Sequence, residues 1–466
     1  MSFNMFLITD THLFENSLGA EGEAYEARSR TDQKCVAETG AILKEAFADL
    51  AADTTTDTII IPGDLVYRGE YESHVSFRKM LDELKAKGKK IYVLTAPHDY
   101  GTAGDDYDSG ACGFIGDKTV PVEKMPREKL REFYYDYGFS QAISEDLNTM
   151  SYVAALNDKI RVMAINVDGN CHDTKGTISD EQMVWIKEQI KDAKDNGCYI
   201  FAMMHYPLLP GSPIMSIIGD AKIKDWENRA NELADAGLDL IFTGHMHMQS
   251  LTRHTSPAGN TITDICTGSI VGWPARYRKI TFNDNGELNI RSLQIDDFQF
   301  RDKKEGQSAE DYFQWRFDRM ITDAIDGMAY NFPAFARFFG GEEKLKPVKP
   351  IVTMIGKLLQ KLTLGGVGKI FWFKVDKSIK DILLKDIGVE LVRNVFTGDQ
   401  PYTPDTPVYQ AAMKLFGRLP LGIVEKKVGA KNPMFADIKG FLGSIMGKEE
   451  KLDNNCDIKV NYDFEV

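Results

Sequence analysis

Aspartate and histidine side chains recur in the first half of the chain, each time directly after an apolar run of strand length. Asp10 and His12 follow the run at 3–9, and Asp64 follows the run at 58–62. Three later runs are followed by the rest of the set: His98, Asp99, His205, His245 and His247. Such side chains converge, because ligand sites of open α/β sheets lie outside the carboxyl ends of the strands. Mixed Asp and His donors suit Mn, Fe, Zn or Ni, so the pattern predicts a metal site.

Each of these motifs, taken alone, is more often part of an exposed surface loop than of a metal site. The sequence Gly-His-Met-His at 244–247 is weak evidence alone, because two nearby histidines on a loop are more often exposed than ligating. However, five of the chain's eight histidines lie within the ordered set. That concentration favours a metal site over coincidence.

Buried strands and amphipathic helices must position these residues. Strand-like runs at 3–9, 58–62, 90–95, 161–166, 199–204 and 238–243 are continuously apolar, as in strands that are buried on both faces. Helical spacing of apolar residues occurs between them, at 34–51, 75–87, 179–195 and 224–236. Residues 260–296 alternate in shorter runs that predict antiparallel hairpins. The alternation predicts an α/β domain over residues 1–300.

The remainder of the chain has a different pattern. Residues 301–311 are charged and are interpreted as a linker, and residues 301–466 as a mainly helical C-terminal domain. Between Ile351 and Leu362 the apolar residues follow helical spacing, with Lys357 and Lys361 on the opposite side. Such a stripe is interpreted as a packed lid or a homo-oligomer interface, with peripheral membrane contact as the alternative.

Composition limits the function further. A chain of 466 residues exceeds the size of one hydrophobic core, so at least two domains are expected. Its net charge of −13 argues against a nucleic-acid partner. Six cysteines without CxxC pairs, the absence of a basic and apolar leader, and the absence of a long apolar run predict a cytoplasmic protein.

As an ordered set the motifs resemble those of the calcineurin-like metallophosphoesterase family. The matching sequences are DxH at 10–12, GDxxxxG at 63–69, a degraded GNHD at 96–99, the isolated His205 and GHxH at 244–247. The resemblance covers residues 3–296. It implies a two-sheet α/β sandwich flanked by helices. It also implies a hydrolase, a phosphatase or phosphodiesterase, acting on a phosphorylated small molecule or another phosphate mono- or diester.

The resemblance also implies a role for each residue of the set. Two divalent metal ions would be held, the first by Asp10, His12, Asp64 and His247, and the second by Asp64, His205 and His245. Two such ions lower the pKa of a bridging water, so that hydroxide can attack phosphorus. His98 would lie near the leaving oxygen as general acid or charge stabiliser, and Asp99 would orient its imidazole or tune its pKa. Arg68 and Arg278 are candidates for binding phosphate oxygens, because the guanidinium fork matches that geometry.

One position departs from the family pattern. Pro97 stands where the family has an asparagine that ligates the second metal, and a proline side chain cannot ligate. The second site should therefore bind its ion more weakly, unless Asp105, Asp106 or Asp108 replaces the ligand. Three functions remain open: an active hydrolase, a catalytically impaired regulatory protein that binds metal or phosphate on the same fold, and a membrane or partner adaptor in which the helical domain acts and the phosphoesterase domain is its scaffold.

Overall fold

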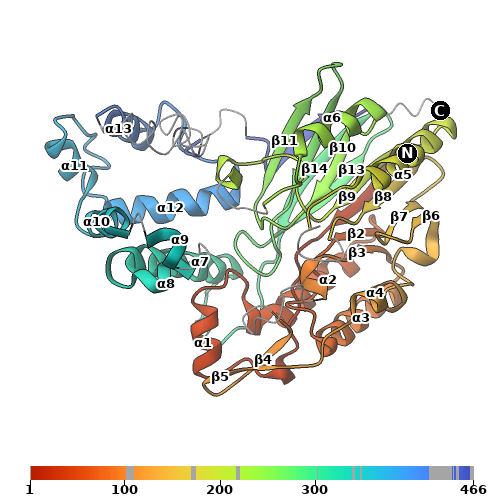
Figure 1. Cartoon of the computed structure of the whole chain (residues 1–466), viewed down its shortest axis with the longest axis horizontal. Coiled ribbons are helices and arrows are strands. Elements are labelled where there is room, and N and C mark those ends of the chain that lie inside the picture. Colours follow the sequence, from red (N-terminus) through yellow and green to blue (C-terminus); the bar gives the residue numbers. More distant parts are fainter. Residues whose placement is uncertain are drawn as a thin grey trace. The chain divides into compact units, whose positions relative to one another are not determined.

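The computed structural model describes residues 2–100, 110–168, 175–216, 221–301, 303–337, 342–346, 349–418, 443, 445–447 and 451–461. The chain folds into two compact units (Figure 1). The first unit comprises Met1–Gly211, Ile218–Phe313 and Leu452–Val466. The second comprises Ser212–Ile217 and Gln314–Lys451.

The first unit contains two large mixed sheets. One has the order β15-β14-β13-β1-β2-β3, with bounds Cys456–Lys459, Glu287–Gln294, Arg276–Phe282, Phe3–Leu7, Thr58–Pro62 and Lys90–Leu94. Strands β1, β2 and β3 are parallel, and β13, β14 and β15 extend the sheet by antiparallel pairing. The parallel strands all end at the same edge, which is where the first motifs of the sequence lie.

The second sheet supplies the remaining motifs. Its order is β11-β12-β10-β9-β8-β7-β6, with bounds Ser250–Thr255, Thr261–Cys266, Leu240–Thr243, Tyr199–Met204, Ile160–Ile165, Ser151–Ala155 and Ala142–Asp146. Strands β8, β9, β10 and β12 are parallel, and β6, β7 and β11 pair antiparallel at the two edges. A separate hairpin joins β4 (Cys112–Ile115) to β5 (Lys118–Pro121).

The core lies between the two sheets. Met5 and Ile60 of the first sheet belong to the same buried cluster as Phe201 and Phe242 of the second. Burying each such side chain contributes about 1.5–3 kcal/mol, so this layer fixes the two sheets face to face. Helices cover the outer faces (Figure 1): α2 (Thr39–Ala52), α3 (Tyr71–Ala86), α5 (Asp180–Asp195) and α6 (Trp226–Ala236). The short helix α1 (Glu23–Ser29) packs against the β4–β5 hairpin, and α4 (Arg127–Phe133) contacts α3 through Phe133.

The second unit is helical in its described residues. Its helices are α7 (Ala309–Tyr330, from Gln314 on), α8 (Phe332–Arg337), α9 (Glu342–Leu345), α10 (Lys349–Leu359), α11 (Leu364–Ile370), α12 (Leu384–Thr397) and α13 (Pro407–Phe416). A core of its own includes Leu364, Ile387, Tyr402 and Val408. None of the described helices combines the length and the apolar character that crossing a membrane requires.

The predicted fold class is confirmed, with two sheets flanked by helices and a helical C-terminal region. The units differ from the predicted division at residue 300, because the boundary falls between Phe313 and Gln314. Phe300 and Tyr312, which flank the predicted linker at 301–311, stack on each other with ring centroids 4.1 Å apart. The last described segment also returns to the first unit. There β15 pairs with β14, and its alternate residues are buried.

Candidate metal centre

The candidate ligands occupy unusual backbone conformations at the strand ends. Ten described non-glycine residues have positive φ, and five of them belong to the predicted ligand set: Asp10, His12, Asp64, His245 and His247, with φ of 51°, 38°, 52°, 67° and 52°. Left-handed conformations are unfavourable for such residues and concentrate where function requires them. The strand ends therefore hold these side chains in orientations that ordinary loops do not adopt.

Glycine allows two of these loops to approach the site closely. An ideal Cβ on Gly244 would lie 2.3 Å from Asp10 Oδ2, and one on Gly63 would lie 2.9 Å from His205 Nδ1. Gly63 also has a φ of 98°. Both glycines directly precede a candidate ligand, so a side chain at either position would force the loops of the two sheets apart.

The side chains converge in three overlapping groups: Asp10, His12 and His247; His12, Asp64 and His98; and Asp64, His205 and His245. Within each group the candidate ligand atoms lie within 4.8 Å of one another. His247 Nε2 lies 3.2 Å from Asp10 Oδ1 and 3.0 Å from His12 Nε2. Asp64 Oδ2 lies 3.6 Å from His12 Nε2 and 3.1 Å from His205 Nε2, so its carboxylate links the first and third groups.

Three of the histidines have their Nδ1 atoms engaged by an oxygen acceptor. Nδ1 of His205 donates to Pro62 O at 3.0 Å, and Nδ1 of His98 donates to Tyr67 O at 2.5 Å. Nδ1 of His247 donates to Gln33 Oε1 at 2.8 Å. Each bond places the proton on Nδ1 and leaves the Nε2 lone pair directed at the site, as in metal-bound histidines.

Burial and opposite charges set the protonation of the cluster. Burial raises the pKa of Asp64, but the surrounding imidazoles, His205 first, outweigh it and hold the pKa well below the usual range. The pKa of Asp10 is lowered in the same way, with His247 the largest opposing influence on burial. Burial lowers the pKa of His12 to about 4. Two ionised carboxylates thus stand beside a neutral imidazole.

His205 behaves differently from His12. Burial lowers the pKa of His205, but the charges of Asp64 and Asp10 outweigh burial and raise it to about 9. In the protein without metal, a proton on His205 therefore neutralises part of the carboxylate charge. A cation at the same place would take over that role and displace the proton.

The residues fit a divalent transition-metal ion. His12 faces the other candidate ligands through Nε2, which lies 3.7 Å from Asp10 Oδ1 and 3.6 Å from Asp64 Oδ2, and His205 faces Asp64 Oδ2 through Nε2 at 3.1 Å. Ligand atoms about 2.0–2.2 Å from one ion lie roughly 3.0–3.5 Å apart, which is close to the spacing among the Asp10, His12 and His247 atoms. Nitrogen and oxygen donors in this mixture suit Mn, Fe, Zn or Ni.

The predicted partnership of Asp99 with the His98 imidazole requires correction. Asp99 Oδ1 accepts the backbone N–H groups of Leu65 and Val66, and Oδ2 accepts that of Ala96. Tyr67 O, not Asp99, contacts the His98 ring nitrogen. Burial, together with the charge of Asp64, raises the pKa of Asp99 well above its usual range. Asp99 therefore ties the loop after β2 to the turn that carries His98.

The third group contains one carboxylate and two imidazoles. The His245 ring lies against Tyr206, with centroids 4.1 Å apart. Pro97 is buried and begins the short helical turn Pro97–Asp99. Its ring therefore occupies the position where an asparagine would offer a side-chain amide oxygen to the second ion. The replacement ligands suggested by the sequence, Asp105, Asp106 and Asp108, lie outside the described residues.

The two candidate phosphate-binding arginines differ in accessibility. Arg68 is 9% exposed, and its Nε and Nη1 atoms have no hydrogen-bond partner. Arg278 is fully buried and donates to Thr267, Gln249 and three backbone carbonyls, those of Cys266, Asp453 and Asn454. Arg278 therefore cannot reach a substrate. It joins β13 to the segment that leads into β15, which corrects its prediction as a substrate residue.

Gln33 is a functional candidate that the sequence did not reveal. Besides accepting from His247, its Nε2 donates to Trp273 O at 2.6 Å. Gln33 is 214 positions from His247 and lies in no motif, so no local signal could identify it.

Comparisons with known proteins agree with the geometry. The sequence pattern of one family, described as calcineurin-like phosphoesterase, matches residues 3–249. No curated protein matches the sequence.

Three solved structures show remote likeness. They are a dimetal phosphatase from Danio rerio (13% identity, 63% of this chain and 97% of that chain, TM-score 0.43), a purple acid phosphatase from yellow lupin seeds, Lupinus luteus (13%, 66% and 53%, 0.40), and an NAD nucleotidase from Haemophilus influenzae (11%, 78% and 62%, 0.32). Likeness at this level assigns no substrate.

Proposed function

Because the chain belongs to the calcineurin-like phosphoesterase family, we propose that it is a metal-dependent hydrolase of phosphate mono- or diesters. The observation that carries the proposal is the convergence of five separate motifs into three overlapping ligand groups that share His12 and Asp64. We further propose that Asp10, His12, Asp64 and His247 hold a first ion, and that Asp64, His205 and His245 hold a second, weaker one.

Two divalent ions would supply charge stabilisation for the phosphoryl group and a water of lowered pKa. The side chains of this protein have separate tasks. Asp64 Oδ1 accepts the backbone N–H of His98 at 3.1 Å, which fixes the Asp64 carboxylate between the groups. His98 donates through Nδ1 to Tyr67 O, so its Nε2 is free to bind a proton and deliver it to a leaving oxygen. The Nε and Nη1 groups of Arg68 are buried from solvent, so Arg68 can contact a phosphate oxygen only through Nη2.

His98 has a second candidate role, because it forms a ligand group with His12 and Asp64. Burial lowers the pKa of His98 well below its usual value, so its imidazole is neutral in the protein without metal. A neutral imidazole can ligate an ion. It can serve as an acid only when a charge change at the site protonates it. We favour the acid, because Asp10, His12, Asp64 and His247 already supply four ligands to the first proposed ion site.

The experiment is elemental analysis of the purified protein, together with hydrolysis of p-nitrophenyl phosphate and bis(p-nitrophenyl) phosphate with added Mn, Zn or Ni. Bound metal and metal-dependent hydrolysis are expected. His98→Gln should lower kcat by roughly 10²- to 10⁴-fold if His98 is the acid, with bound metal unchanged. If His98 is a ligand instead, metal content should fall together with activity.

Pro97 keeps the impaired regulatory protein as the second candidate. An active parent protein would exclude it. A protein that is loaded with metal but inactive on both substrates, with activity appearing only in Pro97→Asn, would replace the hydrolase proposal by this second function.

Exposed apolar side chains of the second unit indicate which kind of partner this unit binds. Met354, Leu358 and Trp372 are 56%, 45% and 87% exposed. Exposed apolar side chains of this size support a homo-oligomer, with membrane contact as the alternative. Light scattering and liposome flotation separate the two. Location in the cytoplasm stays a prediction from the sequence, as does a phosphorylated small molecule as the substrate.

A further inference from the structure

The chain around Lys34 is fixed beside the candidate metal centre. On one side of Lys34, the Gln33 side chain accepts from His247 Nδ1 at 2.8 Å. On the other side, the backbone N–H of Cys35 donates to a backbone carbonyl at 2.8 Å. The backbone N–H of Lys34 itself donates to Asp32 Oδ1 at 3.1 Å. Lys34 therefore has a defined place next to the candidate ligands, although it belongs to none of the motifs.

Asp32 and Tyr67 hold the Lys34 ammonium group. Its Nζ lies 3.2 Å from Asp32 Oδ1 and 5.6 Å from the centroid of the Tyr67 ring. The Tyr67 hydroxyl donates to Asp32 Oδ2 at 2.8 Å, and Tyr67 O accepts from His98 Nδ1 at 2.5 Å. One tyrosine thus contacts both Lys34 and His98. The Lys34 side chain is 13% exposed, so it is not closed off from a ligand at the centre.

The charge of Lys34 acts on two imidazoles of the centre. Burial lowers the pKa of His12, and the charge of Lys34 is the next largest cause. Burial also lowers the pKa of His98; the charge of Asp64 opposes burial, and the charges of His12 and Lys34 act with it. Coulombic effects fall with distance, so the ammonium lies near both rings. An anion bound beside His12 and His98 would therefore be attracted to Lys34 as well.

Positive charge exceeds negative charge around Lys34. Burial raises the pKa of Asp32, but the charges of Lys34 first, then Arg28 and Arg68, help to hold it below the usual range. Glu70 is a second carboxylate that acts on Arg68. These two carboxylates do not neutralise three cations, in a protein whose net charge is −13. A local excess of cations favours an anionic ligand.

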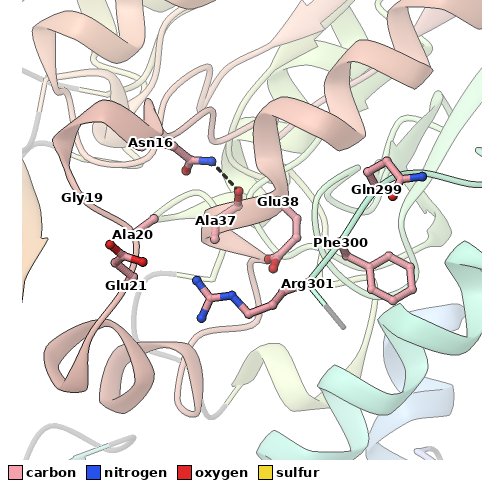
Figure 2. A pocket seen from close by; sticks show the side chains of 9 residues that line it. All are labelled: Asn16, Gly19, Ala20, Glu21, Ala37, Glu38, Gln299, Phe300 and Arg301. Carbon is pink, nitrogen blue, oxygen red and sulfur yellow. Dashed lines mark hydrogen bonds between the residues drawn. The ribbon is translucent and has the colours of Figure 1, made fainter. Parts of the chain in front are cut away.

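A pocket elsewhere in the first unit is less suited to an anion (Figure 2). It has a volume of about 400 Å³ and shares no residue with the candidate metal centre. Its charged lining residues are Glu21, Glu38 and Arg301, and the Arg301 guanidinium lies 3.6 Å from Glu26 Oε1. Two carboxylates in the lining would repel a phosphate, so an anionic substrate is attracted to the Lys34 group instead.

We propose that the Lys34 ammonium binds a non-bridging oxygen of the substrate and makes the metal centre selective for phosphate monoesters. This inference rests on the proposed hydrolase function and names its substrate class. Above its second pKa of about 6, a monoester carries two negative charges on three non-bridging oxygens. A diester carries one negative charge on two such oxygens. Because attraction scales with charge, a fixed cation stabilises a bound monoester more than a bound diester.

The test is isothermal titration calorimetry of the full-length protein loaded with Mn²⁺ at pH 8, with inorganic phosphate and dimethyl phosphate as the probes. The parent should bind inorganic phosphate more tightly than dimethyl phosphate. Lys34→Gln should weaken phosphate binding by roughly tenfold or more, because a charged hydrogen bond is lost, and should change dimethyl phosphate binding much less. Lys34→Arg keeps the charge and should bind phosphate nearly as the parent does.

Lys44→Gln is the matched control, because Lys44 is exposed on α2 and its loss changes the net charge equally. It should bind both probes as the parent does. Equal losses for both probes in Lys34→Gln would show a general change of the centre and would overturn the proposal. Unaltered phosphate binding in Lys34→Gln, or an equal loss in Lys44→Gln, would overturn it too.

Hydrolysis separates this proposal from the proposed function. In Lys34→Gln, kcat/KM should fall by roughly tenfold for p-nitrophenyl phosphate and much less for bis(p-nitrophenyl) phosphate. A parent that hydrolyses these esters while Lys34→Gln alters neither affinity nor preference would overturn the role of Lys34 and leave the hydrolase standing. A parent that binds phosphate through Lys34 but hydrolyses neither ester would support the binding role and remove the hydrolase.

Discussion

Gln33→Leu tests whether a residue outside every motif controls the first metal site. In the structure Gln33 Oε1 accepts from His247 Nδ1 at 2.8 Å, and the opposite ring nitrogen of His247 faces Asp10 at 3.2 Å. Leucine has a similar volume but no acceptor. The substitution therefore removes the bond that fixes the His247 ring and its tautomer, and leaves all the proposed ligands in the chain.

The magnitude follows from the burial of the donor. His247 is 8% exposed, so its Nδ1–H would lose its partner where water has little access. A buried donor without an acceptor costs about 1–3 kcal/mol. Since about 1.4 kcal/mol corresponds to a factor of ten, affinity at the first site should fall roughly tenfold to a hundredfold. The second site should keep its affinity, because its proposed ligands do not include His247.

The assay is competition with a chromophoric chelator, which resolves two affinities, with metal content measured by elemental analysis after dialysis. Gln33→Glu is the matched variant: it keeps an acceptor oxygen at the same reach and should restore binding at the first site. Equal affinities in Gln33→Leu and the parent would refute the orienting role. Equal loss at both sites, without rescue by Gln33→Glu, would show a general structural effect instead.

Three further predictions follow from the same contacts. Arg278→Met should lower the free energy of unfolding by about 3–5 kcal/mol in denaturant titrations, because three carbonyls lose their donor; a raised KM with unchanged stability would restore the substrate role. Burial raises the pKa of Glu70 from its ordinary value of 4.5 to about 7. Its contribution to stability is therefore complete below pH 4.5 and is lost as the pH rises through 7, by about 3 kcal/mol. Glu70→Gln should flatten this dependence between pH 5 and pH 8, and an unchanged slope would contradict the assignment. Ending the chain at Lys451 removes β15 and should destabilise the first unit in the same titrations, whereas unchanged unfolding would show that the strand is dispensable.

Much of the fold could be predicted because strands buried on both faces are continuously apolar. The runs at 58–62 and 199–204 coincide with β2 and β9. The candidate ligands could be predicted for a related reason, since polar residues directly after such runs must lie at a sheet edge. In contrast, β15 is four residues long and is separated from β14 by more than 160 positions, so only tertiary pairing identifies it.

The sequence did not predict the roles of side chains whose hydrogen-bond partners are backbone groups. Asp99 follows His98, which suggested a bond between their side chains, but its oxygens reach three backbone N–H groups instead. Arg278 lies among other charged residues, a pattern typical of an exposed strand. Its burial results from the 453–454 segment, whose backbone carbonyls accept hydrogen bonds from its guanidinium. Patterns of residue type report where a chain turns, whereas hydrogen-bond partners depend on distances that no spacing encodes.

The candidate metal centre contains energetically unfavourable backbone conformations in loops that are held by hydrogen bonds and by buried strands. Five left-handed residues each lower the stability of the protein without metal. The Asp10 and His12 loop is fixed by backbone bonds to the loop after β2, and both loops leave strands that are buried between layers. Because this frame holds the candidate ligand atoms in place, an ion gains ligands that are already oriented. The features that stability alone would not retain at this centre are therefore those that a bound metal ion would use.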